Sequence, residues 1–174
     1  KERDLFEKKK IKDILNVSKN DVILDIGCGI GRWADGMSEK VKKYVGIDYL
    51  DEFINIANIK YKKKNNIYFI NLESTKLSSS KVKSHSPYTI IMIMGLYPYI
   101  NDKEGCDILK NLLKVNANKS KIIIREPIAV KKEIILDNVW SEDMETYYSA
   151  KYRTHDWFKK NFKEILFKEG YNLI

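Results

Sequence analysis

The feature that most constrains this chain is a short apolar segment that runs directly into a glycine-rich turn. Residues 22–33 read Val-Ile-Leu-Asp-Ile-Gly-Cys-Gly-Ile-Gly-Arg-Trp. The glycines at 27, 29 and 31 allow backbone dihedrals closed to other residues, and they leave no side chain between the main chain and a flat ligand. The segment predicts a strand, a nucleotide-binding turn and a helix whose first amides can face a polar or anionic group.

The spacing of the glycines argues against a dinucleotide site. A nicotinamide-dinucleotide turn has the pattern Gly-x-Gly-x-x-Gly, which would need glycine where Arg32 stands. Further along, residues 44–48 read Tyr-Val-Gly-Ile-Asp, which predicts a second short strand that ends in a carboxylate. The two strands, one helix apart, predict a nucleotide site without a pyrophosphate.

Residues 22–48 together resemble the cofactor-binding half of class I S-adenosylmethionine-dependent methyltransferases, with residues 25–31 as their glycine motif. The resemblance covers nearly the whole chain and implies an α/β fold with a doubly wound, mostly parallel sheet of the Rossmann-like methyltransferase type. It implies that Asp48 accepts hydrogen bonds from the cofactor's ribose, although a helix cap near Asp51 is the alternative. In the resembled enzymes an antiparallel strand pair finishes the sheet, and we expect that pair beyond residue 174.

The same resemblance places further cofactor contacts after the third and fourth predicted strands. Glu73 stands where an acid accepts from the adenine amino group, with an ordinary solvated carboxylate as the alternative. Met94 and Gly95 stand along the methionine part of the cofactor. The full set of expected contacts with S-adenosylmethionine is Asp25, Gly27, Cys28, Gly29, Gly31, Trp33, Asp48, Tyr49, Glu73, Ser74, Met94 and Gly95.

Strand and helix patterns alternate along the chain, which is typical of a parallel sheet covered on both faces. The expected strands are 22–25, 44–47, 67–70, 89–94 and 121–125, and the expected helices are 4–15, 32–39, 52–62, 105–115 and 155–168. With 174 residues and 44% hydrophobic content, the chain 1–174 is expected to form one domain. We expect an N-terminal lid helix within 1–19, a cofactor half over 22–77, and a substrate half over 88–174 with a polar insert at 137–155.

Candidate acceptor contacts follow the fourth and fifth strands and fill the insert. Tyrosine rings stack on sugars, and arginine grips a carboxylate or phosphate with two bonds, so the set suits a small polar or anionic acceptor. The expected substrate contacts are Tyr97, Arg125, Tyr147, Tyr148, Tyr152 and Arg153. For Arg125 with Glu126, an ion pair that merely ties the strand end to a neighbour is the alternative.

A hydroxyl acceptor would benefit from a general base. His155 has a suitable unperturbed pKa near 6.5, and Glu126 is the reserve candidate. Thr154, just before it, is a plausible helix N-cap, and His85 is expected to be exposed. The segment 94–100 has one proline and no preceding Asn or Asp, which argues against the class that methylates base amino groups.

The net charge of +8 permits an RNA partner, but lysines are spread through every segment and no RNA-binding signature accompanies them. Nucleic acid is therefore not the favoured partner. Cys28 and Cys106 have no Cys-x-x-Cys spacing, which favours a reducing cytoplasm and no metal site. The apolar run 90–97 is too short for a membrane span.

The sequence thus predicts a cytoplasmic S-adenosylmethionine-dependent methyltransferase, monomeric or homodimeric. Its expected reaction is O-methylation of a sugar, a nucleotide-sugar or a phosphorylated metabolite. Two alternatives stay open, namely an RNA or protein methyltransferase and a non-catalytic cofactor-binding module.

Overall fold

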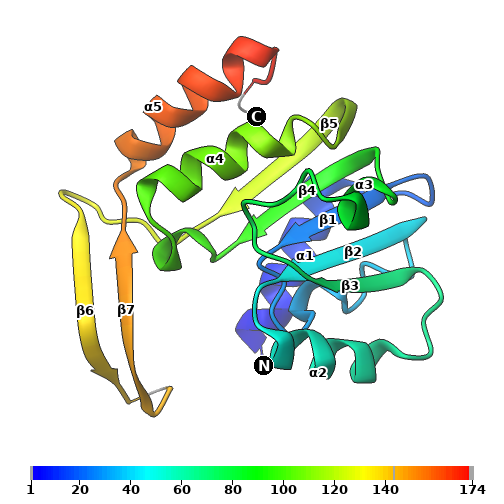
Figure 1. The fold of residues 1–174 in the computed structure, drawn as a ribbon, viewed down its shortest axis with the longest axis horizontal. Coiled ribbons are helices and arrows are strands. Elements are labelled where there is room, and N and C mark those ends of the chain that lie inside the picture. The colour runs from blue at the N-terminus through cyan, green and yellow to red at the C-terminus, as the bar shows by residue number, and fades with distance from the viewer. Residues whose placement is uncertain (1, 143, 173–174) are drawn as a thin grey trace.

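The computed structural model describes residues 2–142 and 144–172, and its centre is a five-stranded parallel sheet in the order β3-β2-β1-β4-β5 (Figure 1). The strands are β1 (Val22–Ile26), β2 (Lys43–Asp48), β3 (Ile67–Asn71), β4 (Tyr88–Met94) and β5 (Asn116–Arg125). Helices cover both faces of the sheet, so the predicted doubly wound, mostly parallel fold is confirmed.

The helices are α1 (Glu2–Leu15), α2 (Asp51–Tyr61), α3 (Ser80–Lys83), α4 (Asp102–Leu112) and α5 (His155–Ile165). The described residues also form three short 3-10 helices, η1 (Arg32–Ala34) after β1, η2 (Tyr97–Tyr99) after β4 and η3 (Phe167–Glu169) after α5. The predicted helix over 32–39 is wrong. Gly36 adopts a left-handed φ of 73°, so the chain leaves the helical conformation soon after η1. Helix α3 forms inside the serine-rich, polar segment 78–87, whose composition predicts a surface loop.

Each face of the sheet carries its own apolar cluster. In β4, Ile91 and Ile93 pack in the cluster that includes α4 and α5, whereas Ile90 and Met92 pack in the cluster that includes α1. Successive side chains of a strand point to opposite faces, so a strand buried on both sides reads as a continuous apolar run. This is why β4 could be predicted from the sequence.

The polar insert forms a β-hairpin rather than an irregular excursion. Strands β6 (Ile134–Ser141) and β7 (Thr146–Tyr152) form a separate antiparallel sheet that projects away from the body of the molecule (Figure 1). The register shifts between Leu136 and Val139, and this irregularity breaks the alternation that would have marked a strand.

Because the five strands of the main sheet are parallel, their carboxyl ends share one edge, and their amino ends share the opposite edge. The strand order reverses between β1 and β4, because β2 and β3 are added on one side of β1 and β4 and β5 on the other. Ligands of such folds bind outside the carboxyl ends of the strands at that point. The apolar end of the chain, which the sequence predicts to be the start of a further strand, reaches residues 173–174, outside the described residues. Among the described residues, no helix has the length and apolar character needed to cross a membrane.

Candidate functional site

The turn after β1 is built from glycines in left-handed conformations. The φ values of Gly27, Gly29 and Gly31 are 74°, 52° and 78°. The amides of Gly27 and Cys28 donate to the carbonyl of Ile47 at 2.9 and 3.0 Å, which joins the turn to β2. A methyl group added at Gly29 would meet no atom within 4 Å, so open space lies in front of this residue.

Asp48, the last residue of β2, faces this turn. Its Oδ2 accepts from the amide of Gly29 at 2.9 Å, and its Oδ1 accepts from the amide of Leu50 at 3.0 Å. These two bonds fix the side chain, and the residue is only 9% exposed. Leu50 immediately precedes α2, so Asp48 supports the start of that helix as well. Each carboxylate oxygen keeps a second lone pair with which a ligand hydroxyl could bond.

Asp25 lies buried beneath the turn. The hydroxyl of Tyr44 donates to its Oδ2, whereas Oδ1 is buried and has no hydrogen-bond partner. Burial raises the pKa of Asp25 to about 7, against the lowering effect of the Tyr44 bond. Burial also raises the pKa of the neighbouring Cys28 thiol, so that thiol stays protonated. Tyr44 was not predicted here, because a tyrosine in a buried strand reads as a core residue.

The turn after β4 lies next to the glycine turn. Gly95 has a φ of 85° and open space beside its Cα, and the side chain of Leu96 lies against Gly27. The amides of Gly95 and Leu96 both donate to Oε1 of Glu126 at 3.0 Å, while its Oε2 is buried without a hydrogen-bond partner. Burial raises the pKa of Glu126 to about 7. The carboxyl ends of β1, β2, β4 and β5 therefore meet at one site.

Other predicted cofactor residues differ in their placement. Tyr49 is exposed, Ser74 and Met94 are half-buried, and Glu73 forms an exposed ion pair with Lys76 at 2.8 Å. Trp33 does not lie open to the crevice. It is 3% exposed and packs in the apolar cluster with α1, so its size serves the core.

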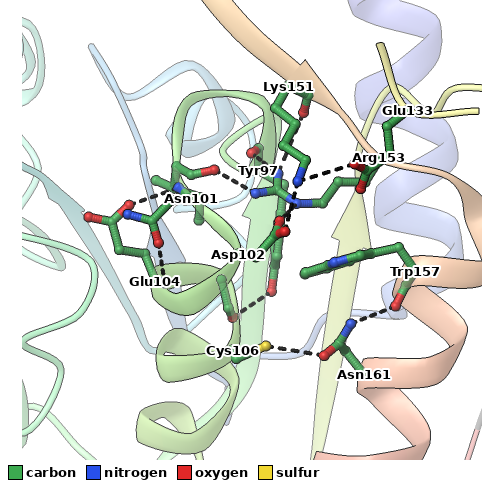
Figure 2. A network of polar contacts seen from close by, with 12 residues as sticks. Tyr97, Asn101, Asp102, Glu104, Cys106, Glu133, Lys151, Arg153, Trp157 and Asn161 are labelled. Carbon is green, nitrogen blue, oxygen red and sulfur yellow. Dashed lines mark hydrogen bonds and ion pairs between the residues drawn. The ribbon is translucent and has the colours of Figure 1, made fainter. Parts of the chain in front are cut away.

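Arg153 is a buried structural cation rather than a free acceptor contact. It is 1% exposed, and its Nε donates to Asp102 at 2.7 Å. Its two terminal nitrogens donate to the carbonyls of Tyr97 and Ile100, and its guanidinium lies 4.8 Å from the ring centre of Trp157 (Figure 2). Arg153 thus joins β7, the loop after β4 and the start of α4 and α5. The predicted substrate role is wrong for this residue, because every bond of its fork is made within the protein.

Tyr97 and Arg125 are also engaged within the protein. Tyr97 is buried in the core, and its hydroxyl donates to the carbonyl of Gly105 at 3.2 Å. Arg125 forms an ion pair with Glu7 of α1, and Glu7 pairs with Arg32 at 2.7 Å as well. The alternative considered for Arg125, a tie from the strand end to a neighbour, is the arrangement that the structure has. Glu7 was not predicted, since an acid in a lysine-rich helix carries no signal.

The hairpin tyrosines lie on two faces. By the register of the hairpin, Tyr148 and Tyr152 share one face, and Tyr147 lies on the other, where it packs on Trp140 with ring centres 5.2 Å apart. The Tyr148 hydroxyl bonds to Tyr152 and raises the pKa of Tyr152. Tyr99, in η2, lies near this pair.

The two histidines lie in different surroundings. His155 is the first residue of α5, its side chain is 71% exposed, and its charged neighbour is Asp156 at 3.9 Å. Among the described residues, no hydrogen bond or ion pair joins its side chain to the strand ends. His85, predicted to be exposed, packs on Tyr68 with ring centres 4.6 Å apart, and its Nδ1 is buried without a partner. Burial lowers the pKa of His85.

A glycine turn fixed to a strand-end carboxylate, at the switch point of a doubly wound sheet, defines a Rossmann-like protein of the class I methyltransferase type. Residues 23–118 match the model of the methyltransferase domain family, and the chain belongs to this family.

Curated relatives and solved structures are similar to parts or most of the chain. A 23S rRNA (uracil(1939)-C(5))-methyltransferase of Aliivibrio fischeri is 27% identical over 81 residues, which are 45% of this chain and 18% of that protein. A tRNA (guanine-N(7)-)-methyltransferase of Clostridium botulinum is 28% identical over 84% of this chain and 72% of its own length. The phosphoethanolamine N-methyltransferase 1 of Haemonchus contortus, solved with S-adenosylhomocysteine, superposes with a TM-score of 0.72 at 19% identity. That match covers 90% of this chain and 33% of the other. The chain thus matches about a fifth of the rRNA methyltransferase and a third of the phosphoethanolamine N-methyltransferase, but most of the tRNA methyltransferase.

Proposed function

We propose that this protein binds S-adenosylmethionine at the carboxyl edge of the sheet and transfers its methyl group to a small polar acceptor. The observation that carries the proposal is the fixed carboxylate of Asp48 beside the open space at Gly29. Gly95 adds a second open position across the crevice. The residues present fit the cofactor, because a nucleoside needs hydroxyl acceptors and a backbone without side chains in its way.

Each proposed cofactor contact has a separate task. Asp48 would accept from the ribose hydroxyls, and Glu73 with Ser74 would border the adenine next to Tyr49. The unpartnered Oδ1 of Asp25 and the turn 27–31 would receive the polar methionine end. S-adenosylmethionine supplies a methyl group on a positively charged sulfur that is its own leaving group. The protein's main task is then to hold the acceptor in line with that methyl group.

For the acceptor, the proposal is O-methylation of a sugar or nucleotide-sugar. Tyr148 and Tyr152 offer rings and hydroxyls to such a ligand, with Tyr147 on the opposite face of the hairpin. Glu126 is the proposed base, because its Oε2 is unpartnered and burial raises its pKa to about 7, near the pH at which a base works best. Arg125 and Arg153 are committed to ion pairs, which supports a neutral acceptor more than a phosphorylated one.

The proposed organisation follows from these roles. Residues 22–77 would hold the cofactor, and residues 88–174 the acceptor. The N-terminal segment 1–19 would act as a lid, since Glu7 of α1 reaches both Arg32 after the glycine turn and Arg125 at the end of β5. We place the enzyme in the cytoplasm, as a monomer or homodimer.

Transfer of the tritiated methyl group of S-adenosylmethionine tests the proposal. The expected result is label in a neutral sugar or nucleotide-sugar, with release of S-adenosylhomocysteine. Label in total tRNA instead would favour the second candidate, an RNA methyltransferase, which the similarity to the tRNA (guanine-N(7)-)-methyltransferase supports. Cofactor binding without transfer to either class of acceptor would indicate a non-catalytic module.

A further inference from the structure

The edge of the sheet opposite the crevice is rich in lysine. We define the amino edge as the connections that enter the five parallel strands together with the first residues of β2 and β5, which are residues 16–21, 39–43, 62–66, 81–87 and 113–121. The lysines in these connections are Lys19, Lys40, Lys42, Lys43, Lys62, Lys63, Lys64, Lys81, Lys83, Lys114, Lys119 and Lys121, and the acidic residues there are Asp21 and Glu39. Lysines that are spread along the sequence are thus gathered on one edge by the parallel topology.

Most of these charges are not compensated. Among the described residues, the amino edge has one ion pair, between Lys64 and Glu39 at 3.0 Å. Lys114 and Lys121 donate to neutral oxygens, at 2.8 and 2.6 Å. Lys19 donates to the carbonyl of Glu39, whereas Lys42 is exposed and its side chain has no hydrogen bond or ion pair among the described residues. Their positive charge is therefore available to a ligand.

The carboxyl edge is different. Arg32, Lys76, Arg125 and Lys151 are each in an ion pair there. The same edge holds the carboxylates of Asp48 and Glu126. The net charge of +8 is therefore expressed mainly at the amino edge, on the far side of the sheet from the hairpin (Figure 1). A polyanion would be attracted to that edge and away from the crevice.

We propose that the amino edge binds the phosphate backbone of a nucleic acid. Five neighbouring strands spaced by ~4.8 Å place the lysine-bearing connections along a row of roughly 20 Å. A nucleic acid duplex carries one charge per ~1.7 Å of its axis, so such a row meets several phosphates. Exposed Asn20, Asn65 and Ser84 lie between the lysines, and side chains of these types also bond to phosphate oxygens.

The surface chemistry fits a nucleic acid better than a membrane or an acidic protein. In the described residues of the amino edge, no large apolar side chain is exposed. Membrane-surface segments insert Trp, Phe or Leu, and protein interfaces have an apolar centre. Contacts with phosphates need neither an inserted apolar side chain nor an apolar centre. Because contacts of this kind are to the backbone, binding is independent of base sequence, and because they lie opposite the crevice, it is independent of the cofactor.

Fluorescence anisotropy with a labelled RNA of about 20 nucleotides, single-stranded and as a duplex, tests the proposal at about 50 mM salt. The amino-edge variant combines Lys42→Glu, Lys63→Glu and Lys83→Glu. Its matched control combines Lys159→Glu, Lys160→Glu and Lys163→Glu, three exposed lysines of α5 with the same change in net charge. We expect affinity to fall at least tenfold in the first variant and less than about threefold in the control. The slope of log K against log salt should decrease by about two to three in the first variant only.

An equal loss in both variants would overturn the proposal, because binding would then follow net charge alone. Absence of RNA binding by the wild-type protein would also overturn it, as would displacement of RNA by S-adenosylhomocysteine. Binding to vesicles of phosphatidylcholine with about 30% phosphatidylserine, without binding to RNA, would assign the edge to a membrane instead. Circular dichroism confirms folding, and the same three positions changed to Gln provide a milder variant that must lose affinity in the same direction.

Discussion

The carboxylate of Asp48, at the end of β2, accepts a hydrogen bond of 2.9 Å from the backbone amide of Gly29 in the turn after β1. The bond joins two neighbouring strand ends through an atom that no substitution at residue 29 removes, short of proline. It places a carboxylate and a backbone free of side chains next to each other before any ligand arrives. The proposed cofactor site is therefore held in place by the fold.

Alanine substitutions at two glycines of the turn should affect cofactor binding and stability differently. A methyl group at Gly31 would lie 2.7 Å from Phe69 and 2.8 Å from Tyr61, at a φ of 78°, so Gly31→Ala should cost about 2–4 kcal/mol in urea unfolding. Gly29→Ala meets no atom within 4 Å and should cost about 1–2 kcal/mol. It should nevertheless weaken S-adenosylhomocysteine binding at least tenfold. Wild-type affinity in Gly29→Ala would contradict this assignment.

Arg153 should be among the most sensitive positions for stability. Arg153→Ala removes the side-chain donors to the carbonyls of Tyr97 and Ile100 and leaves Tyr97 only the long bond of 3.4 Å from the Ile100 amide, so we expect a loss of about 3–5 kcal/mol. Arg153→Lys should recover only part of it, because lysine lacks the planar fork. The control is Arg32→Ala, which removes half-exposed ion pairs and should cost less than about 1 kcal/mol. Similar losses for the two alanine variants would argue against the buried network.

The buried carboxyls predict a dependence of stability on pH. Burial raises the pKa values of Asp25 and Glu126 to about 7, from 3.8 and 4.5 in the absence of the fold. Between these values the folded state holds protons that the unfolded state has released, so their contribution to the free energy of unfolding falls as pH rises from about 5 to 7. Asp25→Asn removes one contribution and keeps an acceptor for Tyr44.

Urea unfolding at pH 5 and pH 7.5 measures that effect. The fall in the free energy of unfolding between the two pH values should be smaller in Asp25→Asn than in the wild type, by on the order of 1–3 kcal/mol. Parallel curves for the two proteins would show that Asp25 is already ionised in the folded state at pH 5.

Two variants should distinguish the candidate bases once transfer to an acceptor is measured. His155→Ala should leave the rate of transfer unchanged, since its side chain is 71% exposed. Glu126→Gln keeps an oxygen for the amides of Gly95 and Leu96 but cannot accept a proton, so kcat should fall by about 10²–10⁴. The rise of activity with pH that reports an ionising group near 7 should disappear in this variant. A large effect of His155→Ala with none of Glu126→Gln would reverse the assignment.

The sheet was predictable because buried parallel strands leave a direct record in the sequence. In β4 both faces are covered, and the five consecutive residues from Ile90 to Met94 are all apolar. The glycine turn and Asp48 were predictable for a similar reason, since the backbone conformation requires glycine at 27, 29 and 31. These are local constraints.

The wrong predictions involve contacts between distant segments. Tyr97 and Arg153 have the residue types of a binding site, but each is buried by elements more than 50 residues away in the sequence. No pattern in the neighbouring sequence distinguishes a buried arginine with four protein acceptors from an arginine whose guanidinium is free to bind a ligand. The lysines of the amino edge show the reverse case. Their even spacing along the sequence hides a clustering that only the parallel topology creates.

Calorimetric titration with S-adenosylhomocysteine, on the wild-type protein and on Asp48→Ala, tests the central claim most directly because it needs no knowledge of the acceptor. We predict micromolar binding to the wild type and a loss of at least tenfold in the variant, with both proteins folded by circular dichroism. Absence of binding to the folded wild type, or equal affinity in the two proteins, would contradict the assignment of the carboxyl edge as a cofactor site.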